Sequence, residues 1–327
     1  MSRALKPPPF RRRALTARRL TPTPQPPSWP SYQGTSSYVG SASSGRVHVF
    51  VDPSLGAEGL QNASDLVLDS DRIVAFNDGV FATSAGEVFV IVFALGGATD
   101  GTGGADHMGC DYVSGNAIEV CASFGRSARV GALFEAELSE CNMGGNLCGV
   151  STGEGLSRWC ATLSSGNALS DFATAPTWWA DGAPNWVDST DSTDQSADST
   201  GCTMAFLSWL FSLGISLPTI AQAIVLAGEG AALCQVYGTL TGDAPSNAWS
   251  KFSAALAALP FGVTSDDPFG ASSPPAPGPV PPAPPPVPAP ATVTVDDAIA
   301  WAAAGLRENW PAIAAGAKAL APVGFGG

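Results

Sequence analysis

Hydrophobic and polar positions change their period near Phe124, and the change divides the chain into a strand-rich part and a helix-rich part. Valine at every second position predicts a strand over Arg46–Val51. The β-branched and aromatic run Glu87–Leu95 ends at two glycines, as a central strand does. Asn116–Phe124 is predicted to be its neighbour, and a short helix is expected over Gly59–Leu68.

Beyond Phe124, apolar residues recur at three- and four-residue spacing, which predicts a succession of helices. The expected helices are Ser127–Cys141, Gly153–Leu163, Ser199–Leu213, Ser216–Ala227, Glu229–Tyr237 and Asn247–Leu259. Gly214, Gly228 and Gly242 follow three of them, where a left-handed cap is wanted. Strands first and helices afterwards predict an α+β domain with a small N-terminal sheet on one side of a helical half.

Composition divides the 327 residues into four segments. Residues 1–45 are rich in Pro, Ser, Arg and Gly and are predicted to be a disordered basic arm, because they cannot bury enough apolar surface. Residues 46–262 are the predicted globular domain, and residues 263–292 are a Pro- and Ala-rich linker. Residues 293–327 carry Ile299, Leu306 and Trp310 at helical spacing and are predicted to dock.

The chain is acidic, with 28 Asp and Glu against 15 Lys and Arg, and much of the positive charge lies in the first twenty residues. A nucleic-acid-binding core is therefore not expected. No segment reaches about eighteen uninterrupted apolar residues, so no membrane span is predicted.

Seven cysteines favour an extracytoplasmic, oxidising compartment, although the N-terminus has no apolar stretch of signal-peptide length. Cys141 and Cys148, with Gly144 and Gly145 between them, are the predicted disulfide.

Glu137 is the principal candidate for chemistry. It falls on the apolar stripe of the predicted helix Ser127–Cys141, where a carboxylate must be paired, protonated or functional. Glu154 opens the next helix, and Arg158 follows it at a spacing of four, on the same helix face. Only two histidines exist, and His107, in a Gly-rich loop, is better placed for a site than His48, which alternates with valines inside a strand.

Four phrases carry a resemblance to a known family: Gly104-Ala105-Asp106-His107, Ala136-Glu137-Leu138-Ser139-Glu140, Gly153-Glu154-Gly155-Leu156-Ser157-Arg158 and Leu240-Thr241-Gly242. Residues 46–260 resemble an uncharacterised bacterial domain with the zincin metallopeptidase layout. The resemblance implies that Ala136 stands in the first zinc-ligand position, Glu137 in that of the base and Glu140 in the second ligand position, with Glu154 a candidate third ligand. Because alanine offers no donor, ordinary zinc binding is not expected.

Three interpretations of these residues remain open from the sequence. Glu137 and Glu154 form a buried structural network with Arg158, which is the favoured interpretation. Alternatively, Glu140 and Glu154, with Asp106 or His107, hold an oxygen-ligated divalent cation. In the third interpretation the residues are catalytic.

The leading functional hypothesis is a zincin-like pseudoenzyme that acts in binding or assembly, through a protein partner or another copy of the chain. The alternative is a hydrolase, either a peptidase or a glycoside hydrolase, that uses Glu137 with Glu140 or Glu154. The first hypothesis predicts that Glu137 is buried within hydrogen-bonding reach of Arg158 or another cation.

Deleting residues 265–327 is expected to leave the fold intact and to remove an association, because the linker separates the amphipathic segment from the domain. Thermal unfolding and size-exclusion chromatography of the truncated and complete chains check this. If the truncated chain loses most of its thermal stability, this division of the chain is wrong.

Overall fold

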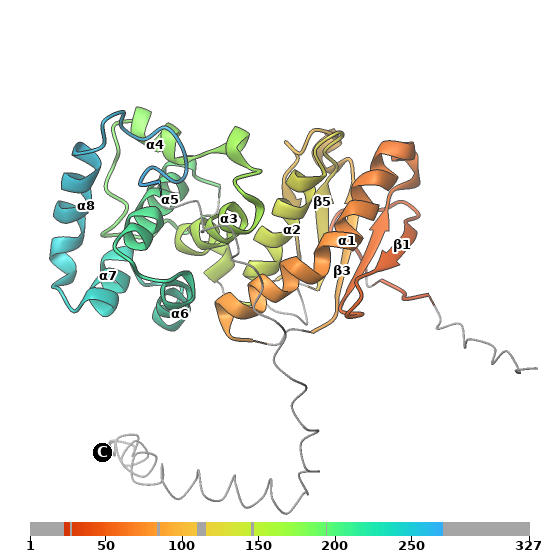
Figure 1. Cartoon of the computed structure of the whole chain (residues 1–327), viewed down its shortest axis with the longest axis horizontal. Coiled ribbons are helices and arrows are strands. Elements are labelled where there is room, and N and C mark those ends of the chain that lie inside the picture. The colour runs from red at the N-terminus through yellow and green to blue at the C-terminus, as the bar shows by residue number, and fades with distance from the viewer. Residues whose placement is uncertain are drawn as a thin grey trace, which may run out of the picture. The chain divides into compact units, whose positions relative to one another are not determined.

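The structure of the chain is a computed structural model that describes residues 23–26, 28–83, 86–109, 116–144, 147–193 and 195–270. These residues form an α+β fold with one five-stranded mixed sheet and eight α-helices (Figure 1). The strands are β1 (Ser37–Ser41), β2 (Val47–Val51), β3 (Val88–Phe93), β4 (Ala105–Asp106) and β5 (Ala117–Cys121). The helices are α1 (Gly56–Phe81), α2 (Ser127–Glu140), α3 (Ser151–Ser165), α4 (Ala175–Ala180), α5 (Ala197–Ser212), α6 (Leu217–Ala227), α7 (Leu233–Thr241) and α8 (Ala248–Ala257).

The sheet has the order β1-β2-β3-β5-β4. The three central strands, β2, β3 and β5, are parallel, and their register places Val49 beside Val90 and Val90 beside Ile118. Near-continuous apolar runs suit such strands because both of their faces are covered. The edge strands β1 and β4 are antiparallel to their neighbours, and β4 is the edge strand that borders the site described below.

Two helices cover one face of the sheet, and an N-terminal segment covers the other. Helices α1 and α2 lie across the first face, where the valines of the central strands join their core (Figure 1). On the second face, Trp29 and Tyr32 pack against Phe50 and Phe93. The prediction of disorder for residues 1–45 is therefore wrong for this part, since aromatic residues on the second face need cover and residues 28–41 provide it.

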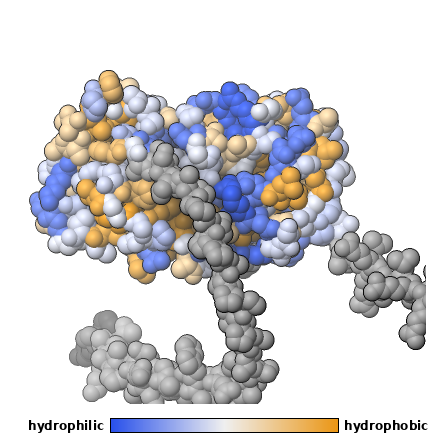
Figure 2. Space-filling model, viewed as in Figure 1, coloured by the Kyte–Doolittle hydropathy of each residue, from blue (hydrophilic) through white to orange (hydrophobic). Residues whose placement is uncertain are grey.

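The helical half is built around α5. Most of that helix is buried, and the aromatic side chains of Phe206 and Trp209 contact Phe252 of α8. The space-filling view shows apolar patches over both the helical half and the sheet half, with hydrophilic residues among them (Figure 2). No helix among the described residues is long and apolar enough to cross a membrane.

The folded domain extends beyond the predicted boundary at residue 262. Val263, Asp266 and Asp267 are buried, and the Asp266 carboxylate accepts hydrogen bonds from the backbone N–H groups of Thr174 and Ala175 at the start of α4. The composition of residues 263–270 gives no sign of these contacts. A truncation at residue 265 would remove them, so the cut belongs after Gly270. The predicted docking segment, residues 293–327, lies outside the described residues.

Five further elements differ from the sequence prediction. Helix α1 runs from Gly56 to Phe81, far beyond the short helix that was expected, because polar residues such as Asn62 and Asn77 on its buried side interrupt the apolar stripe. Helix α7 begins at Leu233 instead of Glu229. Strands β1 and β4 and helix α4 were not predicted, since their short sequences lack the apolar alternation or helical spacing that marks the predicted elements.

Two glycines in helices provide a matched test of the packing between α4 and α5. A Cβ atom at Gly201 would lie 2.4 Å from the carbonyl oxygen of Thr174, whereas one at Gly79 would meet nothing within 4 Å. Gly201→Ala is expected to lower the free energy of unfolding by about 1–3 kcal/mol through overpacking. Gly79→Ala should raise it by about 0.5–1 kcal/mol because alanine is the better helix former. Chemical denaturation measures both, and equal effects at the two positions would contradict the close packing.

Candidate functional site

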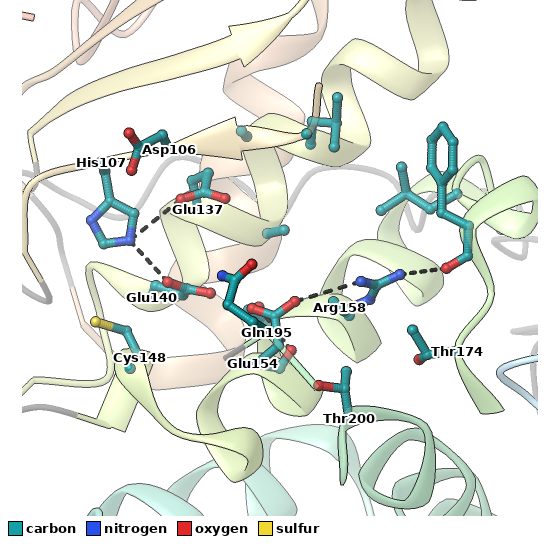
Figure 3. A pocket seen from close by; sticks show the side chains of 18 of the residues that line it. Asp106, His107, Glu137, Glu140, Cys148, Glu154, Arg158, Thr174, Gln195 and Thr200 are labelled. Atoms are coloured by element: carbon teal, nitrogen blue, oxygen red, sulfur yellow. Dashed lines mark hydrogen bonds and ion pairs between the residues drawn. The ribbon is translucent and has the colours of Figure 1, made fainter. Parts of the chain in front are cut away.

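A cavity of about 910 Å³ opens between the sheet half and the helical half. One wall is β4 with the loop that follows it, and the others are α2, α3 and the start of α5. We call this cavity the main cleft. Figure 3 shows its polar side chains, with Asp106 and His107 on the β4 side and Glu137 and Glu140 on α2.

Helix α2 divides its carboxylates between two environments. Glu137 and Glu140, three residues apart, face the main cleft, and their side chains are 14% and 9% exposed. Glu135 points the other way and is completely buried. The predicted apolar stripe was therefore correct for Val130 and Phe134 but not for Glu137, which lies at the rim of the cleft.

His107 joins the two cleft carboxylates. Its Nε2 atom lies 2.9 Å from Oε2 of Glu140 and 3.4 Å from Oε2 of Glu137. The backbone N–H of Gly109 donates to Nδ1, which places the proton of the neutral imidazole on Nε2, toward the carboxylates. Burial alone would lower the pKa of His107, but its hydrogen bond with Glu140 and the charge of Glu140 outweigh burial, so the pKa is raised.

Arg158 lies elsewhere in the cleft. Its Nη1 atom is 3.6 Å from Oε1 of Glu154, and its Nη2 donates to the carbonyl oxygen of Phe172 at 2.6 Å (Figure 3). The predicted pairing of Glu154 with Arg158 at a spacing of four is confirmed. The predicted cation for Glu137 is not Arg158, because Glu137 faces the loop after β4 and contacts His107 instead.

The side chains of the main cleft, with the bonding and protonation described above and below, do not form a set of ligands for a zinc ion. Ala136 lines the cleft with a methyl group where the zincin resemblance requires a donor. The ligand atoms of His107, Glu140 and Cys148 all lie within 4.8 Å of one another, but Cys148 is disulfide-bonded and offers no thiolate. Since Nε2 of His107 carries a proton for the carboxylates, imidazole ligation would also require the ring to change its tautomer.

The predicted disulfide between Cys141 and Cys148 is not formed. Cys141 is a buried thiol at the end of α2, whereas Cys148 takes part in a disulfide bond. Cys160 and Cys202 are also buried thiols, and burial raises the pKa of Cys202 to about 12. These thiols are held as apolar core residues, and nucleophilic chemistry is not expected of them.

Comparison of the chain with models of known protein families and with curated proteins finds no match. The candidate site therefore rests on geometry. The structure brings together His107, Glu137 and Glu140, and it places Glu154 and Arg158 in the same cleft. Sequence reasoning missed Gln195 and Thr200, which line the cleft from the start of α5 and carry no motif that would reveal them.

Sequence reasoning also missed the buried carboxyl group of Glu135. Asn77 and Ser139 donate hydrogen bonds to its Oε1, each at 3.0 Å, while Oε2 has no hydrogen-bond partner among the described residues. Burial raises the pKa of Glu135 to about 8. The group is therefore mainly protonated at neutral pH, in the core directly behind the cleft.

Glu135 is expected to make the protein less stable as the pH rises. Its pKa in the folded state lies above that of an unfolded glutamate, so its contribution is complete below about pH 4.3 and is lost between that value and about pH 8. Relative to Glu135→Gln, the free energy of unfolding of the wild type should fall by up to about 1.4 kcal/mol per pH unit in this window. Denaturant unfolding across this range measures the difference. Parallel curves for the two proteins would contradict a protonated Glu135, and exposed Glu58→Gln is the control.

Proposed function

We propose that the domain is a zincin-like binding module that lacks ordinary zinc chemistry and takes an extended, positively charged polypeptide segment into the main cleft. The position of Glu137 and Glu140 on the cleft face of α2 carries this proposal. Two carboxylates that stand together at the wall of an open cavity attract a cation, and the single imidazole of His107 that they share does not balance both of their charges.

The charge of the surroundings supports a cationic ligand. Residues 23–270 contain 25 Asp and Glu but only six Lys and Arg. Asp106 and Glu154 add to the carboxylates of the main cleft, where Arg158 is the one Arg or Lys among the described lining residues. A cleft lined by one sign of charge concentrates field lines and raises the rate at which oppositely charged ligands associate.

The edge of the sheet supports a polypeptide as the ligand. Strand β4 pairs with β5 on one side, and no other strand among the described residues pairs with its outer side. An extended peptide binds such an edge through main-chain hydrogen bonds, and alternate side chains then enter the adjoining cavity. Ala105 and Asp106 of β4 both line the main cleft, so a basic side chain bound beside them would reach the α2 carboxylates.

A hydrolase is the second candidate, and the geometry of His107 favours it. An imidazole that carries its proton toward two carboxylates is a group suited to general acid–base work near neutral pH. In this alternative Glu137 is the base that activates water, and Glu140 or Glu154 is its partner. The substrate would be a peptide or a glycoside.

Replacing the cleft carboxylates is expected to weaken peptide binding. A labelled, acetylated peptide with one arginine should bind the complete chain, and Glu137→Gln and Glu140→Gln should each weaken binding by about tenfold, because each removes a charge-assisted hydrogen bond. Glu229→Gln, on an exposed turn, is the matched control and should have no effect. Fluorescence anisotropy at two salt concentrations measures the affinities.

Equal affinity of all four proteins would contradict the proposed site. Incubation of the same peptide, and of a chromogenic glycoside series, with the wild type and with Glu137→Gln separates the two candidates. Turnover that depends on Glu137 would favour the hydrolase over the binding module.

A further inference from the structure

A second cavity, of about 360 Å³, adjoins the main cleft. Thr102 and Phe172 line both cavities, so the two spaces are neighbours at the N-terminal end of α2. The second cavity differs in charge, because Arg126 and Arg129 line it. We call it the arginine pocket.

The arginine pocket is built around a buried guanidinium. Arg129 is 5% exposed, donates a hydrogen bond to the carbonyl oxygen of Asp100 at 2.6 Å and lies 4.5 Å from the ring centroid of Phe172. Its Nε atom, however, has no hydrogen-bond partner among the described residues. The hydroxyl of Ser123, which also lines the pocket, is completely buried and likewise has no partner in the described part of the chain. Two buried polar groups beside this pocket thus have no hydrogen-bond partner in the described part of the chain.

The face of α2 connects this pocket with the main cleft. Arg126, Arg129, Leu133, Glu137 and Glu140 recur at three- and four-residue spacing, and all five line one cavity or the other. The charges run against the helix dipole, with arginines at the positive N-terminal end and glutamates at the negative C-terminal end. For the stability of the helix alone, glutamates at the N-terminal end and arginines at the C-terminal end would be favourable. The observed arrangement instead suits a ligand that is anionic at one end and cationic at the other.

The distribution of basic residues also favours an anionic ligand in the arginine pocket. Residues 23–270 contain only six Lys and Arg, and two of them line this small pocket. Both guanidinium groups bind Oδ2 of Asp171, and their hydrogen bonds lower the pKa of that carboxyl group. Asp171 is about half exposed and lies in the short 3-10 helix Ser170–Phe172, so an exposed internal carboxylate occupies the pocket. The second acid, Asp100, is turned toward Thr102, from which its Oδ1 accepts two hydrogen bonds.

We propose that the arginine pocket binds the C-terminal carboxylate of the polypeptide whose basic side chain is bound in the main cleft. This inference rests on the proposed function and adds the direction of the ligand and its free end. Arg129 and Glu140 are separated by about 16 Å along the helix axis. An extended peptide covers that distance with about five residues. The ligand is therefore a C-terminal tail with a basic residue about four positions before its end.

A pair of peptides tests the proposal. Both have the sequence acetyl-Arg-Ala-Ala-Val-Ala, and one ends in a free carboxylate whereas the other ends in an amide. The free acid is expected to bind the complete chain about tenfold or more tightly than the amide, because a carboxylate held by arginine is a charge-assisted contact. Arg126→Gln should weaken binding of the acid several-fold, because Arg129 then holds the carboxylate alone, and should leave the affinity for the amide unchanged. Asp171→Asn should increase the affinity for the acid, since the internal competitor is removed.

Arg72→Gln is the matched control. Arg72 is a similarly exposed arginine that is also paired with an aspartate, Asp69, and its replacement should alter neither affinity. Equal binding of the acid and the amide to the wild type would overturn the arginine pocket and leave the proposed function standing. If neither peptide binds, the proposed function fails and the arginine pocket fails with it. Thermal unfolding of each variant excludes loss of folding as the cause of weaker binding.

Discussion

Packing of α2 on both sides is the constraint from which the candidate site follows. The helix lies between the sheet half and α3, and all but three of its fourteen residues are buried. Such a helix cannot rotate or slide without opening the core, so the direction of each side chain is set by the fold. Glu135 is consequently held in the core as a neutral group, while Glu137 and Glu140 are held at the wall of the cleft.

The surroundings of each glutamate of α2, and not its residue type, determine what that carboxyl group contacts. Three glutamates within six positions of one helix have different surroundings: Glu135 has amide and hydroxyl donors, whereas Glu137 and Glu140 share one imidazole. His107 is brought to them by the loop after β4, the shortest strand among the described residues. The main cleft and the arginine pocket then place opposite charges at the two ends of the same helix face, and this arrangement gives a bound chain a direction.

The sequence predicted those parts of the structure that depend on local pattern. Valine alternation indicated strand β2, the apolar run of β3 indicated a central strand, and three- and four-residue periodicity located α2, α3, α5 and α8 within a few positions. The pairing of Glu154 with Arg158 could also be foreseen, because both residues lie on one helix. The buried polar residues of α1, the two-residue strand β4 and the cover that Trp29 provides have no periodic signal, and tertiary contacts determine them. For the same reason, the partner of Glu137 could not be read from spacing, since His107 comes from another element.

Paramagnetic relaxation in solution tests the central claim, that a peptide lies along α2 with its carboxylate at the N-terminal end of the helix. A nitroxide label is attached to the N-terminus of a peptide with a basic first residue and a free C-terminus, and amide resonances of the complete chain are recorded with the label oxidised and reduced. The account predicts strong broadening at His107 and at residues 137–140, and weak broadening at residues 126–129. Stronger broadening at residues 126–129 than at residues 137–140, or broadening confined to other surfaces, would contradict it.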